Sequence, residues 1–314
     1  MLVNLVPEFL ATLTASDPSA AYHEYLDRHR PILSAYWQNY VIDPQSPHAE
    51  PIIDAAVRAD RSDLKRLLED VDVIALAEDA LRRSAELLEA DCPVDLYVMV
   101  GVGAANAGEL VVGGRGIAFV CLEHFTGRAN AQTYGMGLSP QLLPLWVAHE
   151  VAHALRYTSP SSRAAMRRLV GELGGYYDAW EVGSRASLRE LVANEGVAIA
   201  ASQAVAPGYD PWEYFGYNRR QYRRLRELDA FLRRSSADDL DASGLGLKLR
   251  YLSGGMSPSA RLLAGKVLPE RSGYYLGLRL VENYLAEHGA ASAVRAAVEE
   301  LRQADDRASG IQTA

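Results

Sequence analysis

The feature that most restricts how this chain can fold is a helical segment, residues 145–155, that is apolar on nearly every side. Its apolar residues surround the helix instead of forming one stripe: Trp146, Val147, Val151, Ala152, Ala154 and Leu155. A helix with this distribution is buried, so the rest of the chain has to pack around it. The segment also carries His149, Glu150 and His153, and buried polar side chains need partners because their desolvation is costly. We therefore expect the polar centre of the protein to lie on this helix.

The spacing of these three polar residues is typical of a metal site. His149 and His153 are four positions apart, so in a helix they share a face, about 6 Å from each other, and can bind one tetrahedral ion. Glu150 lies one position round the helix, where its carboxylate can reach a water on the ion more easily than the ion itself. The His-Glu-x-x-His pattern therefore predicts a zinc site with Glu150 as general base. The alternative, two hydrogen-bonded histidines on an exposed face, is disfavoured by their apolar neighbours.

A third protein ligand has to come from elsewhere in the chain, and Glu172 is one candidate. It follows His153 by eighteen residues, a spacing that some zinc peptidases use. However, glycines flank Glu172 at an expected helix end, where an exposed glutamate is the usual case. Pro160 also interrupts the intervening chain.

Glu195 is the second candidate and the one we expect to bind the metal. It lies in a helix that begins at a predicted capping box formed by Ser187 and Glu190. Its neighbours at helical spacing are all apolar: Leu191, Val192, Ala198 and Ile199. A lone carboxylate there would lose much of its solvation unless it is protonated or paired, and a zinc ion would be a suitable partner. The alternative is a buried ion pair with an arginine.

The pattern along the chain predicts three regions. Residues 1–91 are expected to be helical, residues 92–158 to combine strands with the apolar helix, and residues 159–314 to be helical again. Strands are expected at 94–100, 109–112 and 116–122, and the glycine-rich turn at 113–116 indicates a hairpin. Helices are expected near 141–157, 161–170, 188–206, 211–233, 258–266, 273–287 and 290–304. These elements predict an α+β protein, one compact unit in which helical regions flank a small, mostly antiparallel sheet with the active-site helix.

The charge of the chain argues against two classes of partner. Its 32 basic and 40 acidic residues give a net charge of -8, so the overall field does not favour nucleic acid or anionic membranes. No apolar run reaches the about eighteen residues that a membrane helix needs, and residues 1–13 lack the basic start of a signal peptide. The arginines of 219–226 are interpreted as the solvated face of an amphipathic helix. Since Cys92 and Cys121 are expected to be reduced, we expect a cytoplasmic protein.

Three motifs together resemble a known group of enzymes. The His149-Glu150-x-x-His153 motif followed by Asn194-Glu195-Gly196-x-Ala198 resembles the gluzincin metallopeptidases, whose third ligand is a glutamate in a similar helix. More narrowly, the chain resembles an uncharacterised bacterial family described only as predicted zinc-dependent proteases. In that family a Gly-Tyr-x-x-Gly segment follows near the C-terminus, and residues 273–277 are similar to it. The similarity covers roughly residues 94–288. The chain departs from the familiar gluzincin pattern in the forty-one residues that separate His153 from Glu195.

The resemblance implies a zincin-like fold and hydrolysis of peptide bonds in a peptide or protein substrate. One Zn²⁺ per chain would be held by His149, His153 and Glu195, with one position open for water. Two alternatives stay open: a zinc hydrolase of a non-peptide amide, and a zinc-binding protein without turnover. Glu150 counts against the zinc-binding protein without turnover, because a purely structural site does not need a carboxylate that activates water.

Further residues are expected around the reacting bond. A tyrosine usually stabilises the oxyanion in gluzincins, and Tyr274 is the first candidate here, followed by Tyr275. His124 ends a predicted strand and could reach the site, although a surface histidine is the more common case. Zincins commonly bind substrate as an added strand, so residues 116–122 are expected to form the open edge of the sheet. The alternative is that they form an interior strand.

Overall fold

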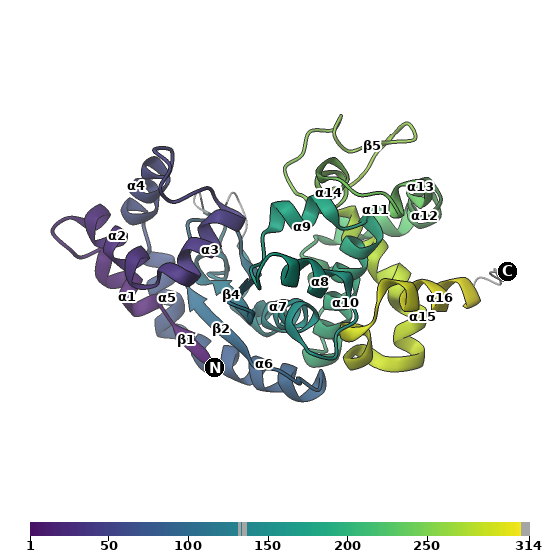
Figure 1. Cartoon of the computed structure of the whole chain (residues 1–314). Coiled ribbons are helices and arrows are strands. Elements are labelled where there is room, and N and C mark those ends of the chain that lie inside the picture. Colours follow the sequence, from purple (N-terminus) through teal and green to yellow (C-terminus); the bar gives the residue numbers. More distant parts are fainter. Residues whose placement is uncertain (131–132, 134–136, 309–314) are drawn as a thin grey trace.

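The computed structural model of the chain combines a small mixed sheet with helices that precede it, cover it and follow it (Figure 1). The structure describes residues 1–130, 133 and 137–308. The α+β class expected from the sequence is confirmed. A separate two-stranded antiparallel sheet lies in the C-terminal region, formed by β5 (Leu262–Leu263) and β6 (Lys266–Val267).

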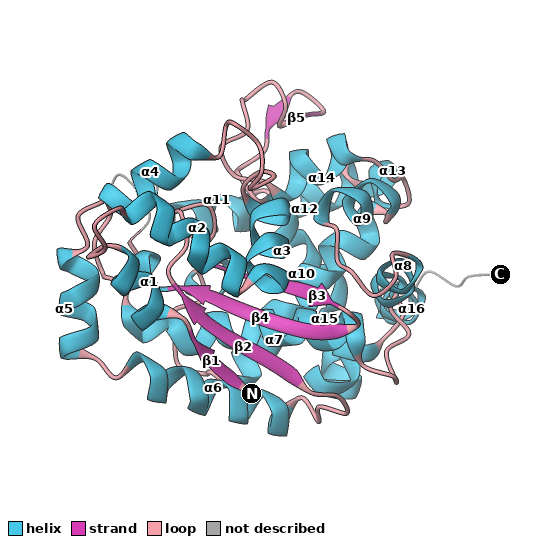
Figure 2. Ribbon diagram, turned by 60° about the vertical axis from the view of Figure 1, so that its left-hand side comes forward, coloured by secondary structure: helices cyan, strands magenta, loops and turns pink. Residues whose placement is uncertain are grey.

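The main sheet has four strands in the order β1-β2-β4-β3 (Figure 2). They span Leu2–Asn4 (β1), Val94–Met99 (β2), Ala107–Val112 (β3) and Arg115–Cys121 (β4). Strand β2 is parallel to both β1 and β4, and only β3 and β4 are antiparallel. The prediction of a mostly antiparallel sheet is therefore wrong. The β3–β4 hairpin was identified, but β2 pairs with β4 instead of with β3, the next strand in the chain, and residues 5–93 separate β1 from β2. Strand patterns reveal neither of these pairings.

The N-terminal region is helical apart from β1, which the sequence analysis missed because it has only three residues. Its helices span Val6–Thr12 (α1), Pro18–Arg28 (α2), Arg30–Tyr40 (α3), Glu50–Arg58 (α4), Ser62–Asp70 (α5) and Val73–Leu87 (α6). The carboxylate of Asp17 caps α2 by accepting a hydrogen bond from the backbone N–H of Ala20 at 3.1 Å, with Pro18 in the first turn.

Helix α7 (Leu143–Thr158) is the apolar helix of the sequence analysis, and its expected burial is confirmed. Every residue from Leu145 to Tyr157 is buried. The helix lies against β4 and β3 on one face of the sheet, where Gly116 permits close approach to the backbone of Ala154. On the opposite face, α3 packs Tyr36 and Tyr40 against the ring of Phe119.

The C-terminal region surrounds the far side of α7 (Figure 1). Its helices span Ala165–Glu172 (α8), Ala179–Arg185 (α9), Leu188–Val205 (α10), Arg219–Glu227 (α11), Asp229–Ser235 (α12), Ala237–Leu240 (α13), Leu245–Leu252 (α14), Ser272–Arg295 (α15) and Val298–Ala308 (α16). Gly289 interrupts α15 with non-helical angles.

Two helix predictions in this region are wrong. The expected helix at 258–266 is the β5–β6 hairpin, whose turn contains Ala264 and Gly265 with positive φ. The expected helix at 211–233 is divided, because Gly216 takes the left-handed conformation after a short 3₁₀ turn and α11 starts only at Arg219.

Buried apolar residues from all three regions share one cluster, which extends along the sequence from Leu5 to Ala304. The region boundaries drawn from the sequence stay predictions. Within the described ranges, the structure has no helix with both the length and the apolar character needed to cross a bilayer.

Candidate metal centre

Three side chains from two helices converge at the centre of the molecule. The Nε2 atoms of His149 and His153, both on α7, are 3.1 Å apart. The Oε2 atom of Glu195, on α10, lies 3.3 Å from the Nε2 of His149 and 3.5 Å from that of His153. Both histidines are 2% exposed, and the Glu195 side chain is 15% exposed. Among the described residues, this is the one group of three or more potential ligands with converging atoms.

The separations within this group match those expected of ligands to a single ion. Four ligands placed tetrahedrally at about 2.0–2.1 Å from zinc lie about 3.3 Å from one another. The three measured distances, 3.1, 3.3 and 3.5 Å, scatter around that value. Two imidazoles and one carboxylate are also a ligand set that suits zinc. The residues present therefore fit this ion.

Glu195 reaches this position because a buried ion pair ties α10 to α7. Ser187 starts α10 by accepting a hydrogen bond from the backbone N–H of Glu190 at 3.2 Å. The carboxylate of Glu190 does not complete the expected capping box: it accepts a hydrogen bond from Arg156 of α7 at 3.0 Å. Both side chains of this pair are 1% exposed. The buried glutamate–arginine pair considered for Glu195 thus exists at Glu190, five residues earlier in the same helix.

The competing ligand Glu172 lies elsewhere. It ends α8 at the surface, where its carboxylate pairs with Arg185 and, more loosely, with Arg168. The structure therefore brings Glu195, and not Glu172, to the two histidines.

Electrostatics within the group follow from burial and from mutual attraction. Burial disfavours the protonated form of His153, but the charges of Glu195 and Glu109 outweigh this effect and raise the pKa of His153 to about 10. Burial raises the pKa of Glu195, yet the adjacent histidines hold it well below its usual range. Burial lowers the pKa of His149. Glu195 and His153, whose Oε2 and Nε2 atoms are 3.5 Å apart, therefore stabilise each other's charged form.

Glu150 is positioned as a buried carboxyl group beside the cluster. It is 4% exposed, and burial raises its pKa well above the usual value. The charge of Glu109 on β3 is the next largest cause of this increase. A carboxyl group with a raised pKa can both accept and return a proton near neutral pH.

Glu109 is a polar residue of this centre that the sequence analysis missed. Its Oε1 accepts a hydrogen bond from the hydroxyl of Tyr157 at 3.0 Å. Tyr157 accepts in turn from the Nδ2 of Asn194 at 2.9 Å, and its ring lies 6.0 Å from that of His153. The available signal was that Glu109 is the only charged residue in Ala107–Val112, an otherwise apolar strand.

Tyr274 lies at the centre, whereas Tyr275 does not. The Tyr274 ring is nearly parallel to that of His149, with 6.4 Å between the ring centroids. Burial, followed by the charge of Glu195, raises the pKa of Tyr274 well above its usual value, so its hydroxyl keeps its proton. The Arg271 guanidinium lies 4.3 Å from the Tyr274 ring centroid. Tyr275 points into the core, where its ring packs near Phe215.

Tyr274 is brought to the centre by a close contact between two glycines. A Cβ atom on Gly196 of α10 would lie 2.2 Å from the carbonyl carbon of Gly277 on α15. A Cβ atom on Gly277 would lie 1.7 Å from the carbonyl oxygen of Val192. Neither position can hold a larger side chain at this helix separation. The contact explains why glycines occur next to Glu195 and three residues after Tyr274.

Two further predictions about the site are wrong. His124 is fully buried instead of lying at the surface, and its charged neighbours are Glu123 and Arg61 rather than residues of the metal centre. Residues 116–122 form the interior strand β4 and its end, because β2 and β3 pair with it on both sides. The edge strand next to α7 is β3.

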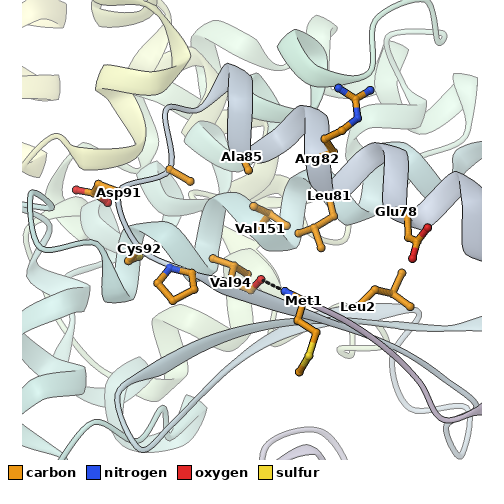
Figure 3. A pocket seen from close by; sticks show the side chains of 12 residues that line it. Met1, Leu2, Glu78, Leu81, Arg82, Ala85, Asp91, Cys92, Val94 and Val151 are labelled. Atoms are coloured by element: carbon orange, nitrogen blue, oxygen red, sulfur yellow. Dashed lines mark hydrogen bonds between the residues drawn. The ribbon is translucent and has the colours of Figure 1, made fainter.

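A cavity of about 610 Å³ lies away from this centre, between α6, the start of β1 and residues 90–94 (Figure 3). Val151 is its lining residue from α7, and two positions along a helix place this side chain on the face opposite His149. Figure 3 also shows the amino group of Met1 donating to the carbonyl of Val94 there, at 3.2 Å. The cavity therefore does not belong to the metal centre.

Comparisons of the chain with protein-family models, with curated proteins and with solved structures found no match.

Proposed function

We propose that this chain is a zinc-dependent metallopeptidase with a zincin-like fold. The observation that supports the proposal best is the convergence of His149, His153 and Glu195 at separations of 3.1 to 3.5 Å. These three residues would hold one Zn²⁺ per chain and leave a position open for water. Zinc bound there would lower the pKa of the water towards 7 and polarise the substrate carbonyl.

Glu150 acts as the general base in this proposal. Its buried carboxylate accepts a proton from the attacking water and later passes it to the leaving nitrogen of the peptide. The raised pKa of Glu150 suits the second step, because a carboxyl group that is a stronger base than usual also retains the proton until the nitrogen receives it.

Tyr274 stabilises the negative charge that develops on the carbonyl oxygen. Its hydroxyl remains protonated and can donate a hydrogen bond to the oxyanion. The ring is fixed between His149 and the guanidinium of Arg271, so the donor is positioned before the substrate binds. The positive charge of the half-buried Arg271 adds to the attraction for an oxyanion. The free thiols of Cys92 and Cys121 support a reducing, cytoplasmic location for the enzyme.

Metal analysis of purified variants tests the ligand assignment. The wild-type protein should contain about one equivalent of zinc, and the His149→Ala, His153→Ala double variant should contain none. Glu195→Ala should lose most of the metal, whereas the matched control Glu172→Ala should keep it, because Glu172 is paired at the surface. Full zinc retention by Glu195→Ala would contradict the assignment.

Peptide hydrolysis tests the catalytic roles. Glu150→Gln should keep the metal and lose turnover. Tyr274→Phe should lower kcat by about 100-fold with little change in KM, the loss typical of one oxyanion donor. Tyr275→Phe is the control, since that ring lies in the core. If no member of a peptide library is cleaved while a non-peptide amide is hydrolysed, the peptidase proposal would have to be replaced by that of an amidase.

A further inference from the structure

Glu109 is an acidic residue beside the proposed reacting centre. Among the described residues, no lysine, arginine or histidine forms a salt bridge with it, although Lys248 and His153 are near enough for its charge to act on them. Its Oε1 accepts a hydrogen bond from the hydroxyl of Tyr157. The hydroxyl of Tyr40 lies 3.0 Å from both its Oε2 and its main-chain oxygen, and can donate to only one of them at a time. The side-chain hydrogen bonds that hold this carboxylate in place therefore come from neutral hydroxyl groups. The residue is half-buried, so part of its surface is open to solvent.

The carboxylate belongs to the centre without being one of its metal ligands. Tyr157 connects Glu109 to Asn194, the neighbour of Glu195 in the chain. The charge of Glu109 also acts on Glu150 and on His153. The converging ligand group, however, contains only His149, His153 and Glu195.

The same strand is closed to an extended substrate. The Tyr40 hydroxyl accepts a hydrogen bond from the main-chain N–H of Glu109 at 3.1 Å. The main-chain N–H of Tyr177 donates to the carbonyl of Val111 at 3.0 Å. These main-chain groups lie on the edge of β3 that points away from β4. An added strand would have to pair with this edge. A peptide that reaches Glu109 from the metal therefore cannot continue along β3, and must end or turn there.

We propose that Glu109 binds a positively charged ammonium group of the substrate next to the bond that is hydrolysed. This inference rests on the proposed peptidase function and names its substrate class: peptides with an ammonium group close to the cleaved bond. The closed strand edge suits the free amino terminus of a peptide, and a lysine side chain would offer the same chemistry. A charge-assisted contact in a half-buried site supplies binding that an uncharged substrate lacks.

Hydrolysis of matched peptides by the zinc-loaded protein and its Glu109→Gln variant tests the inference. The peptides are penta-alanine amide with a free amino terminus, its N-acetylated form, and N-acetylated forms with lysine or norleucine at the central position. Glutamine keeps an acceptor for the tyrosine hydroxyls, and Glu172→Gln is the matched control at an exposed, paired glutamate. Circular dichroism and thermal unfolding verify the fold of each variant.

The expected result is a 10- to 100-fold loss of kcat/KM in Glu109→Gln, confined to peptides that carry an ammonium group. A loss on the free-terminus peptide identifies the chain end, and a loss on the lysine peptide identifies the side chain. An equal loss on charged and uncharged peptides, or no loss, would overturn the inference. If Glu109→Gln does not fold, Glu109→Asp retracts the charge by one methylene and should show a smaller loss with the same selectivity.

Binding separates this inference from the proposed function. Calorimetry measures binding of the same peptides to two zinc-loaded proteins. One is the Glu150→Gln variant, which is expected to bind peptides without cleaving them, and the other is the Glu150→Gln, Glu109→Gln double variant. Ammonium peptides should bind 10- to 100-fold more weakly to the double variant, and the acetylated alanine peptide should bind equally to both. If the wild-type protein cleaves none of the peptides, the proposed peptidase function is rejected, but the role of Glu109 in binding is not. Equal affinity of both variants for the ammonium peptides would reject the role of Glu109.

Discussion

Replacing Gly277 by alanine tests how the helices that carry Glu195 and Tyr274 are held together. The substitution adds one methyl group where α15 crosses α10. That group would lie 1.7 Å from the carbonyl oxygen of Val192, about 1.6 Å short of an ordinary C···O contact of about 3.3 Å. The obstructing atom belongs to the backbone of a buried helix, so no side chain can move aside. The two helices have to separate or tilt.

The expected change in stability combines two opposite effects. Alanine is favoured over glycine in a helix by about 1 kcal/mol. Overpacking a well-filled core costs about 1–3 kcal/mol, and more when the backbone has to move. Because the overlap is with backbone, we expect Gly277→Ala to lower the free energy of unfolding by about 2 kcal/mol or more. Displacing α15 by about 1 Å would also move Tyr274 and lower turnover by about 100-fold.

Urea unfolding followed by tryptophan fluorescence and circular dichroism measures the first effect. The matched control is Gly171→Ala in α8, because no atom lies within 4 Å of the position its methyl group would take. We expect this control to be unchanged or stabilised by up to about 1 kcal/mol. If Gly277→Ala is as stable as Gly171→Ala and retains full turnover, the helix contact does not position Tyr274 and the reasoning fails.

Three further predictions follow from the same structure. Glu190→Gln leaves the buried Arg156 without its carboxylate partner, so the free energy of unfolding measured in urea should fall by about 3–5 kcal/mol. A decrease below about 1 kcal/mol would show that backbone carbonyls alone satisfy the arginine. Glu109→Gln removes a charge that raises the pKa of Glu150, and Glu150 works as a base only when it is ionised. The acid limb of the pH profile of kcat/KM for an uncharged substrate should therefore move to lower pH, and an unmoved limb would contradict this coupling. Zinc at 100 to 1,000 times its Kd should raise the free energy of unfolding by about 3–4 kcal/mol, and a chelator should reverse this increase. Identical unfolding curves with and without zinc would exclude a zinc site in the folded state.

The burial of α7 could be predicted because its cause is local. Apolar residues on every side of one helix permit only a buried position, whatever surrounds it. The convergence of His149 and His153 follows in the same way from helical spacing. Glu195 could be chosen over Glu172 because a carboxylate with apolar neighbours at helical spacing requires a partner, whereas one between glycines does not.

The direction and order of the strands could not be predicted, because they depend on which strands pair. Strand β2 does not pair with β3, the next strand in the chain, but with β4 and with the distant β1. Strand β4 has the apolar character of either an edge or an interior strand, and only its pairing with β2 and β3 decides between them. The importance of Glu109 was missed for the same reason. One acidic residue in a strand is unremarkable until Tyr40 and Tyr157, from two different helices, are seen to hold its carboxylate.

The sequence by itself determined a buried helix, the two histidines and the glutamate that share its centre, and a second helix with a carboxylate in need of a partner. Those conclusions rest on spacing within single helices and on the desolvation of single side chains. The tertiary structure decided that Glu190, and not Glu195, pairs with Arg156, that Tyr274 faces His149, and that the strand edge beside Glu109 is closed. Each of these depends on how separate elements cross, and packing between distant segments fixes that geometry.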